Sequence, residues 1–391
     1  MIAEPTDEAG VATAILAARA AREPVLVRGG GSKAGMLRPV QAARTLSTRF
    51  LTGITLYSPQ ELIIAARAGT PLAEVEAAVA AKGQHLIAEP PDLSGLLGPG
   101  TQTIGGVVAT NMSGPRRVAW GAMRDHVMGV RAVNGAGEVF HSGGRVLKNV
   151  TGLDLCKLLT GSHGTLAVMT EVTLKVLPRP ERTGTLVLRG LDAVRGVAAL
   201  SAALGSPYGV SGAAWLPNAA SLGIAGSAAL VRLEDFTASV AYRSERLRAD
   251  LAEFGAADLL DDEASLVVWR AIRDAAPLAA ADTDAVWRVS VRPSAGPGVL
   301  ATVTASGARG YLDWGGGLVW VAGPPSLHAA VTGAARTASG TWTVLRGPEP
   351  MRAAVDVVPA EPAPLARITR RVKAAMDPDG ILNPGRLYPG L

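Results

Sequence analysis

Two glycine-rich segments near the start of the chain constrain its fold more than any other feature. Residues 28–33 read R-G-G-G-S-K, and residues 99–114 read P-G-T-Q-T-I-G-G-V-V-A-T-N-M-S-G. Glycines lack a Cβ, so a ligand can approach the backbone N–H groups closely, and successive N–H groups bind phosphates well. Either segment alone is typical of an ordinary turn. Together, with a strand–helix–strand pattern between them, they predict a site for a long ligand that carries a diphosphate.

The two commonest nucleotide-binding motifs are absent from these segments. A P-loop requires G-x-x-x-x-G-K-[ST], whereas here Lys33 follows Ser32 and the order is reversed. A Rossmann fingerprint requires G-x-G-x-x-G at the start of a helix, and no such continuation follows residues 29–31. The diphosphate site is therefore predicted to be of another kind.

Further stretches carry a family resemblance. They are P-P-D at residues 90–92, G-S-H-G-T-L-A-V-M-T-E-V-T-L-K-V-L-P at 161–178 and D-P-D-G-I-L-N-P-G-R-L at 377–387. With the two glycine segments, they resemble the FAD-binding domain of the vanillyl-alcohol oxidase/p-cresol methylhydroxylase superfamily. Residues 113–130 and the D-W-G-G-G-L-V-W-V stretch at 313–321 are similar to the FAD-binding E subunit of glycolate oxidase. The resemblance covers almost the whole chain.

This resemblance implies the fold class and a division of the chain. The expected fold is α+β, with a two-part FAD-binding domain of the p-cresol methylhydroxylase type and a cap domain built on an antiparallel sheet. The FAD-binding domain is expected over residues 1–180, the cap or substrate domain over 181–350, and a segment returning to the first domain over 351–391. Pro178 and Pro180 support a boundary there, because prolines interrupt regular elements.

The resemblance also implies FAD as cofactor and a set of residues that contact it. Many relatives bind FAD covalently through a histidine beside the first glycine loop; that loop has none here, so noncovalent FAD is expected. The implied cofactor-binding residues are Gly29, Gly30, Gly31, Ser32, Lys33, Pro91, Gly100, Thr101, Thr103, Gly105, Gly106, Asn111, Ser113, Gly114, Gly161, Gly164 and Val168.

Local patterns predict several individual elements. Strands are expected at 25–27, 62–68, 84–88, 166–176, 186–188, 286–291, 301–304 and 318–321, with a hairpin at N-G-A-G, residues 134–137. Thr70 is expected to cap a helix that ends at Lys82, before Gly83. Other helices are expected after Thr6, around 236–254 and 264–275, and at 363–375.

Composition narrows the choice of partners. The net charge is +5, but no run of Lys or Arg is longer than two, so the charge favours anionic small molecules over nucleic acid. Charged residues make up only 18% of the chain, which indicates either a surface covered by a partner or simply many Ala and Gly residues. Residues 196–231 carry no charge, and they are either partner surface or buried core.

The cysteine count and the N-terminus bear on electron transfer and location. Cys156 is the only cysteine, so the chain cannot ligate an iron–sulfur cluster, which takes about four. Acidic residues stand where a signal peptide would be basic, and no segment is a clean apolar span. A cytoplasmic protein is expected, which partner proteins can still hold at a membrane.

Candidate catalytic residues are few. A 2-hydroxy acid requires a cation for its carboxylate, a base for the hydroxyl proton and a path for hydride to the flavin. Arginine suits the carboxylate, and the candidates are Arg116, Arg117, Arg288 and Arg292. His126 is the candidate base. For each arginine taken singly, a phosphate contact, an ion pair or a surface position remains the alternative.

The resemblance implies a role in oxidising glycolate or D-lactate within a complex. The partners implied are a second, larger FAD subunit and an iron–sulfur subunit. Relatives that turn over 2-hydroxy acids carry a metal-binding H-x-G-D-G-N-x-H cluster in the cap, and this sequence has none, so no metal is expected. A self-sufficient oxidoreductase and a subunit that keeps FAD only as a scaffold are the alternatives.

Overall fold

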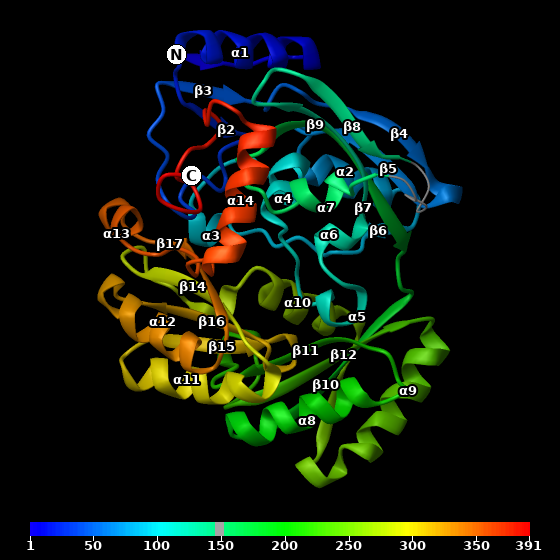
Figure 1. Ribbon diagram of the computed structural model, residues 1–391. Coiled ribbons are helices and arrows are strands. Elements are labelled where there is room, and N and C mark those ends of the chain that lie inside the picture. The colour runs from blue at the N-terminus through cyan, green and yellow to red at the C-terminus, as the bar shows by residue number, and fades with distance from the viewer. Residues whose placement is uncertain (145–151) are drawn as a thin grey trace.

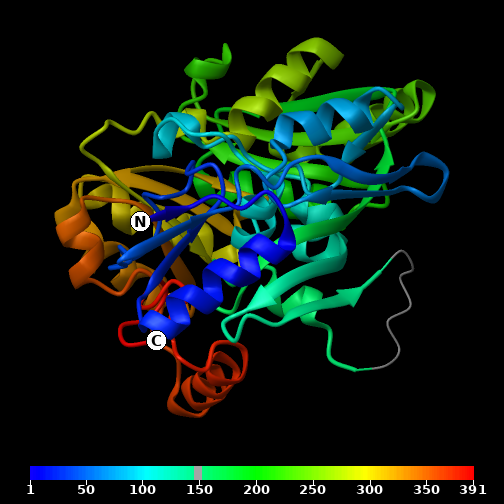
Figure 2. The same ribbon diagram turned by 90° about the horizontal axis from the view of Figure 1, so that it is seen from above.

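The computed structural model describes residues 1–144 and 152–391. Its described part contains three β-sheets, each in a separate layer of the molecule (Figures 1 and 2). The first is a small parallel sheet of order β1-β3-β2, formed by β1 (Ile2–Ala3), β2 (Val25–Arg28) and β3 (Arg44–Ser47). Helix α1 (Glu8–Ala21) packs on it through Val11, Ile15 and Ala18, and Asp7 caps the helix at Gly10 N, 2.7 Å away.

The second sheet has the order β4-β5-β9-β7-β8, and β6 pairs with β9 beside it. Its strands are β4 (Ile54–Ser58), β5 (Ile63–Arg67), β6 (Gln84–Leu86), β7 (Val127–Asn134), β8 (Val139–Gly143) and β9 (Ala167–Pro178). The helices in this part of the chain are α2 (Leu72–Ala80), α3 (Ser94–Leu97), α4 (Ile104–Thr110), α5 (Arg117–Trp120), α6 (Met123–His126) and α7 (Leu155–Leu159), of which α3 and α5 contact the third sheet. The hairpin predicted at residues 134–137 joins β7 to β8, where Asn134 Oδ1 accepts from the N–H groups of Ala136 and Glu138 at 2.9 Å.

The third sheet is antiparallel and has the order β13-β10-β12-β11-β15-β16-β14-β17. Its strands are β10 (Arg182–Arg189), β11 (Val210–Leu216), β12 (Ala228–Asp235), β13 (Ala257–Leu260), β14 (Ala285–Ser290), β15 (Arg309–Asp313), β16 (Leu318–Gly323) and β17 (Thr341–Arg346). Its helices are α8 (Ala193–Gly205), α9 (Thr237–Asp250), α10 (Asp262–Arg273), α11 (Gly296–Ala305) and α12 (His328–Thr337). Figure 1 shows α8 and α11 on the outer face and α10 on the face turned toward the first half of the chain.

We call this third sheet with its helices the cap. The chain leaves the second sheet at the end of β9 and enters the cap at β10. The short 3-10 helices of the described chain are η1 (Pro59–Glu61), η2 (Ala220–Leu222), η3 (Ala252–Phe254), η4 (Ala276–Leu278), η5 (Pro293–Ala295), η6 (Trp314–Gly316) and η7 (Pro325–Leu327). The fold is thus a mixed helix and sheet fold with an antiparallel cap.

After the cap, α13 (Glu349–Ala354) and α14 (Ala363–Met376) lead to a tail that lies against β2 (Figure 1). Leu382 forms a parallel bridge with Val25, and Asn383 Oδ1 accepts from Val27 N at 2.7 Å. The buried Asp377 holds the turn that begins the tail, because it accepts from Lys373 Nζ at 2.7 Å and Leu382 N at 2.8 Å. The C-terminal tail is therefore placed beside the first glycine segment.

Three expectations about local structure were wrong. Residues 301–304 lie in α11, because Pro297 starts a helix whose Val299, Leu300 and Val303 are buried. Helix α2 ends at Ala80 and its N-cap is Pro71. The Thr70 hydroxyl, expected to cap α2, instead donates to Arg67 O at 2.7 Å.

The uncharged residues 196–231 contribute both core strands and surface segments to the cap. Every residue of β11 is buried, and so are the first six of β12. This stretch contributes most of α8, all of β11 and the first half of β12, whereas its connecting segments at 205–209 and 217–226 are largely exposed.

Candidate functional site

A cavity of about 290 Å³ lies where β2, α4, β9 and the C-terminal tail meet. The first glycine segment forms one wall and the start of α4 another. Residues from all four elements line it: Leu26, Val27, Arg28, Gly29, Gly30, Gly31, Ser32, Lys33, Ala34, Pro39, Val40, Thr48, Ala68, Thr103, Gly105, Gly106, Ala109, Thr110, His163, Gly164, Ala167, Val168, Met169, Glu349, Arg352, Asn383 and Arg386.

The two glycine segments contact each other directly along this cavity. Gly31 forms a parallel bridge with Thr101. A Cβ on Gly30 would lie 2.1 Å from Thr101 O, and one on Gly29 would lie 2.3 Å from Thr103 Oγ1. Gly29 and Gly30 are therefore required mainly because a side chain at either position would prevent the two segments from packing together. Gly31 has φ +88° and open space where a Cβ would lie, so its backbone faces the cavity without obstruction.

Gly105 and Gly106 do not lie in a loop, as the glycine-loop interpretation implied, but in the first turn of α4. Thr103 caps this helix by accepting from Gly106 N at 3.3 Å, and neither glycine has a positive φ. A Cβ on Gly105 would lie 2.6 Å from Ala68 Cβ and 2.8 Å from Ala68 O. At Gly106 the nearest atom would be Thr103 Oγ1 at 3.1 Å. Gly105 thus packs against Ala68, the residue after β5, whereas Gly106 leaves room at the cavity.

The structure brings many of the predicted cofactor-binding residues to this one cavity. Those that line it are Gly29, Gly30, Gly31, Ser32, Lys33, Thr103, Gly105, Gly106, Gly164 and Val168. Those that do not line it are Pro91, Gly100, Thr101, Asn111, Ser113, Gly114 and Gly161. Two of the second group instead bond to the start of α6: Asn111 Oδ1 accepts from Arg124 N at 2.9 Å, and Ser113 Oγ accepts from Met123 N at 2.9 Å. All of these FAD contacts stay predictions.

The cavity is also lined by residues from the C-terminal part of the chain that were not predicted as site residues. Asn383 donates from Nδ2 to His163 O at 2.8 Å and so links the tail to the G-S-H-G segment. Arg352 and Arg386 bring two cations to the cavity, and Glu349 brings an acid. The N-P-G-R stretch at residues 383–386 was recognised as part of the family resemblance. However, no local sequence pattern indicates that Arg386 lies beside the first glycine segment.

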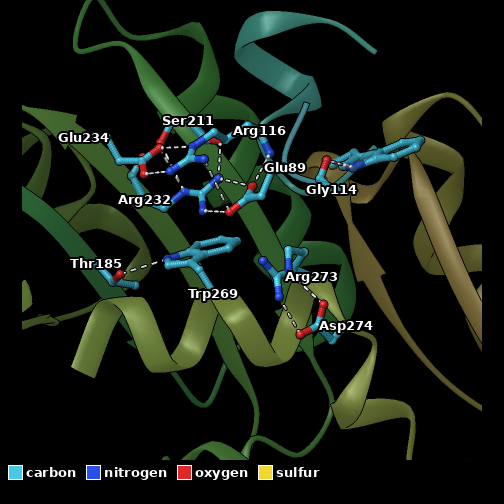
Figure 3. A network of polar contacts seen from close by, with 11 residues as sticks. Glu89, Gly114, Arg116, Thr185, Ser211, Arg232, Glu234, Trp269, Arg273 and Asp274 are labelled. Carbon is cyan, nitrogen blue, oxygen red and sulfur yellow. Dashed lines mark hydrogen bonds and ion pairs between the residues drawn. The ribbon is translucent and has the colours of Figure 1, made fainter. Parts of the chain in front are cut away.

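A buried ion network crosses from the second sheet's side of the molecule to the cap (Figure 3). Arg232 of β12 donates to both oxygens of Glu89, at 2.8 and 3.0 Å. Arg116 donates to both oxygens of Glu234, at 2.7 and 3.0 Å. Arg232 also lies 4.7 Å from the Trp269 ring centre. Burial alone raises the pKa of the Glu89 carboxyl, but Arg232 and Arg116 lower it below its usual value.

This network includes Arg116, one of the candidate arginines for binding the substrate carboxylate. Both fork donors of Arg116 face Glu234, and Glu89 lies 3.9 Å away, so its charge is matched inside the protein. Arg292 and Arg117 are exposed, and Arg117 lies 4.7 Å from the Trp314 ring centre. The candidate base His126 is buried; its Nε2 has no hydrogen-bond partner in the described chain, and burial lowers its pKa.

Arg288 of β14 is the remaining candidate. Its guanidinium lies between Trp314 and Trp320, with 5.1 and 5.2 Å from Cζ to the ring centres. Among the described residues no carboxylate lies within ion-pair distance, and the one hydrogen bond runs from Nη1 to Met112 Sδ at 3.8 Å. Burial and then the charge of Arg117 lower the pKa of Arg288 to about 10. The cation thus lies against aromatic rings with no carboxylate at ion-pair distance, and the charge of the nearby Asp313 opposes the lowering of its pKa.

Comparisons with known proteins agree with this geometry. Residues 1–143 match the family model of an FAD binding domain. The chain is 34% identical over 373 residues to the glycolate oxidase subunit GlcE of Escherichia coli (strain K12), which is 95% of this chain and 94% of that protein. It is 32% identical over 167 residues to the glycolate oxidase subunit GlcD of Bacillus subtilis (strain 168), 42% of this chain and 34% of that one.

A solved structure shows the same fold. The 4-ethylphenol oxidase of Gulosibacter chungangensis superimposes with a TM-score of 0.71 at 13% identity, over 99% of this chain and 89% of that one. Fold and matches together define the class: this is an FAD-binding protein of the p-cresol methylhydroxylase type. Within that class, the chain belongs to the family of the glycolate oxidase E subunit, GlcE.

The cavity fits the cofactor of this family. At Gly31 and Gly106 the wall is bare backbone, and Arg28, Lys33, Arg352 and Arg386 give the cavity positive charge. The first glycine loop carries no histidine, which agrees with noncovalent FAD. In the described ranges, no helix combines the length and apolar character that crossing a membrane takes. Those ranges likewise contain no group of His, Cys, Asp or Glu that could hold a metal ion.

Proposed function

We propose that this chain is the FAD-binding subunit of a glycolate oxidase or dehydrogenase complex. In that complex it oxidises glycolate or D-lactate to the 2-oxo acid and passes the electrons to a partner subunit. Support comes from the relative GlcE, from GlcD as a second glycolate oxidase subunit among the relatives, and above all from one observation. Arg288 of the cap presents an unmatched cation to Met112, two residues beyond Thr110, which lines the cavity.

The chemistry follows from this placement. Bound FAD supplies a two-electron acceptor for the hydride of the substrate's α-carbon. Arg288 would hold the carboxylate with its planar fork, and the rings of Trp314 and Trp320 would keep the fork in one plane and exclude water. Asp313, next to Trp314, is the buried carboxyl that we add as a candidate for the hydroxyl proton. Burial raises its pKa to about 7, so it titrates near neutral pH.

We expect Arg288→Met to raise the KM for glycolate about 10- to 100-fold, the loss expected for a charge-assisted hydrogen bond. Arg288→Lys keeps the charge but not the fork, and it should restore only part of the affinity. The measurement is dye-coupled glycolate oxidation by the reconstituted complex, at equal flavin content.

The matched control is Arg292→Met, which removes an exposed arginine four residues further along. It should leave KM unchanged. An Arg288→Met protein that retains both its flavin and the original KM would show that the carboxylate binds elsewhere.

Division of labour within the complex gives a separate prediction. The chain's single cysteine, Cys156, is buried and cannot carry electrons through a cluster. We therefore expect slow dye reduction by the isolated chain, which we place in the cytoplasm or at a membrane through its partners. Addition of a second FAD subunit and an iron–sulfur subunit should raise the rate. Equal rates per flavin would identify a self-sufficient oxidoreductase, and activity of the complex without this chain's flavin would identify a scaffold.

A further inference from the structure

Two arginines from the C-terminal part of the chain line the FAD cavity with no acidic partner at ion-pair distance. Arg352 belongs to α13 and is only 8% exposed, and Arg386 belongs to the tail and is partly buried. Neither forms a salt bridge with any described residue. With Lys33 they make three cations around the loop that follows the first glycine segment, and we call them the C-terminal cation cluster.

The hydrogen bonds of both arginines go to backbone carbonyls of that loop and its surroundings. Arg386 donates from Nη2 to Lys33 O and from Nη1 to Arg38 O, both at 3.1 Å. Arg352 donates from Nη1 to Leu37 O at 2.8 Å and from Nε to Gly347 O at 2.9 Å. Within the described chain, Arg386 Nε and Arg352 Nη2 have no acceptor, so each guanidinium keeps donors for a ligand.

The cluster carries uncompensated charge. Burial, and then the charge of Arg352, lower the pKa of Arg386 to about 10. Burial lowers the pKa of Lys33 to about 8, although Asp92 opposes this shift. The acid on the same cavity, Glu349, raises the pKa of Arg352, but burial outweighs it. Arg28 also lines the cavity, so four cations stand against one acid there, which is costly in a partly dry cavity unless an anion joins them.

FAD offers one permanently anionic group. Oxidised isoalloxazine, ribityl, ribose and adenine are neutral at pH 7, whereas the diphosphate carries two negative charges. We propose that Arg386, Arg352 and Lys33 bind the FAD diphosphate and neutralise it, so that the C-terminal part of the chain completes a site whose other half is the glycine backbone. This inference rests on FAD binding and not on the proposed substrate.

The test is the dissociation constant of apoprotein for FAD and for riboflavin, measured by quenching of flavin fluorescence. Arg386→Met and Lys33→Met should each weaken FAD about 10- to 100-fold and leave riboflavin unchanged, because riboflavin has no phosphate. Arg386→Lys should recover part of the loss. Inorganic pyrophosphate should raise the melting temperature of the wild-type apoprotein but not that of Arg386→Met.

The matched control is Arg371→Met, which removes an exposed arginine of α14. It should change neither ligand's affinity. Lys33→Met is informative even if an arginine variant fails to fold, because no hydrogen bond of the described structure depends on the Lys33 amine. Unchanged FAD affinity in Lys33→Met and Arg386→Met would overturn the proposal. An equal loss for FAD and riboflavin would overturn it too, since the arginines would then only hold the loop.

Discussion

Gly106→Val is expected to leave the protein folded but nearly free of flavin. Gly106 lies in the first turn of α4 with an ordinary helical φ, and its missing Cβ borders the cavity. Valine would keep the helix, since only Thr103 Oγ1 at 3.1 Å has to adjust, but its two methyl groups would occupy ligand space. Bound flavin per chain should fall to about a tenth or less. Absorbance at 450 nm against protein content, with circular dichroism for the fold, measures both.

Two glycine variants separate the cavity from the helix. Gly298 lies in α11, is exposed and has open space at its Cβ position, so Gly298→Val should keep its flavin. Gly105→Val should instead lower stability, because its Cβ would meet the Ala68 backbone at 2.8 Å. A folded Gly106→Val protein with full flavin would place the cofactor away from the start of α4.

The elements that the sequence predicted well are those fixed by local chemistry. The hairpin between β7 and β8 depends on Asn134, whose side chain bonds to residues two and four positions on. Helix α1 is set by its Asp7 cap and by the spacing of Val11 and Ile15. Residues 301–304 were expected to form a strand because Val and Thr favour strands, but packing of α11 on β15 overrides that preference.

The candidate site was predictable only in part, because its residues meet over long distances in sequence. The glycine clusters were visible, but not that Gly30 and Thr101 pack against each other. Arg386 reaches Lys33 across 353 positions, and Arg116 reaches Glu234 across 118. Local sequence patterns, such as hydrophobic periodicity, carry no information about contacts between residues so far apart in the chain. The arginines could therefore be named as candidates, while their partners, which decide the role of each, could not.

Arg232→Met is expected to destabilise the protein most, by about 3–5 kcal/mol, the cost of removing one partner from a buried ion pair. Arg232 is 1% exposed, and its loss leaves Glu89 and Glu234 with Arg116 alone. It also removes the cation from the Trp269 ring. Because Glu89 comes from the first half of the chain and Arg232 from the cap, the two parts should separate more easily. Urea unfolding measures the free energy, with limited proteolysis at the 178–182 connection.

The stability difference between the wild type and Arg232→Met should depend on pH, whereas a simple packing defect would not. In the wild type the pKa values of Glu89 and Glu234 are lowered, so their stabilisation is present above about pH 4.5 and declines as the pH falls below it. In Arg232→Met we expect burial to outweigh the remaining charge of Arg116 and to raise the Glu89 pKa, so that protonation of Glu89 removes part of the destabilisation. The difference in stability should therefore be largest near pH 7 and shrink toward pH 4.5. Arg189→Met, which breaks the exposed pair with Asp258 at 2.9 Å, is the control and should cost less than about 1 kcal/mol at either pH. A difference that stays constant with pH would mean that Arg232 acts through its packing on Trp269 and not through its charge.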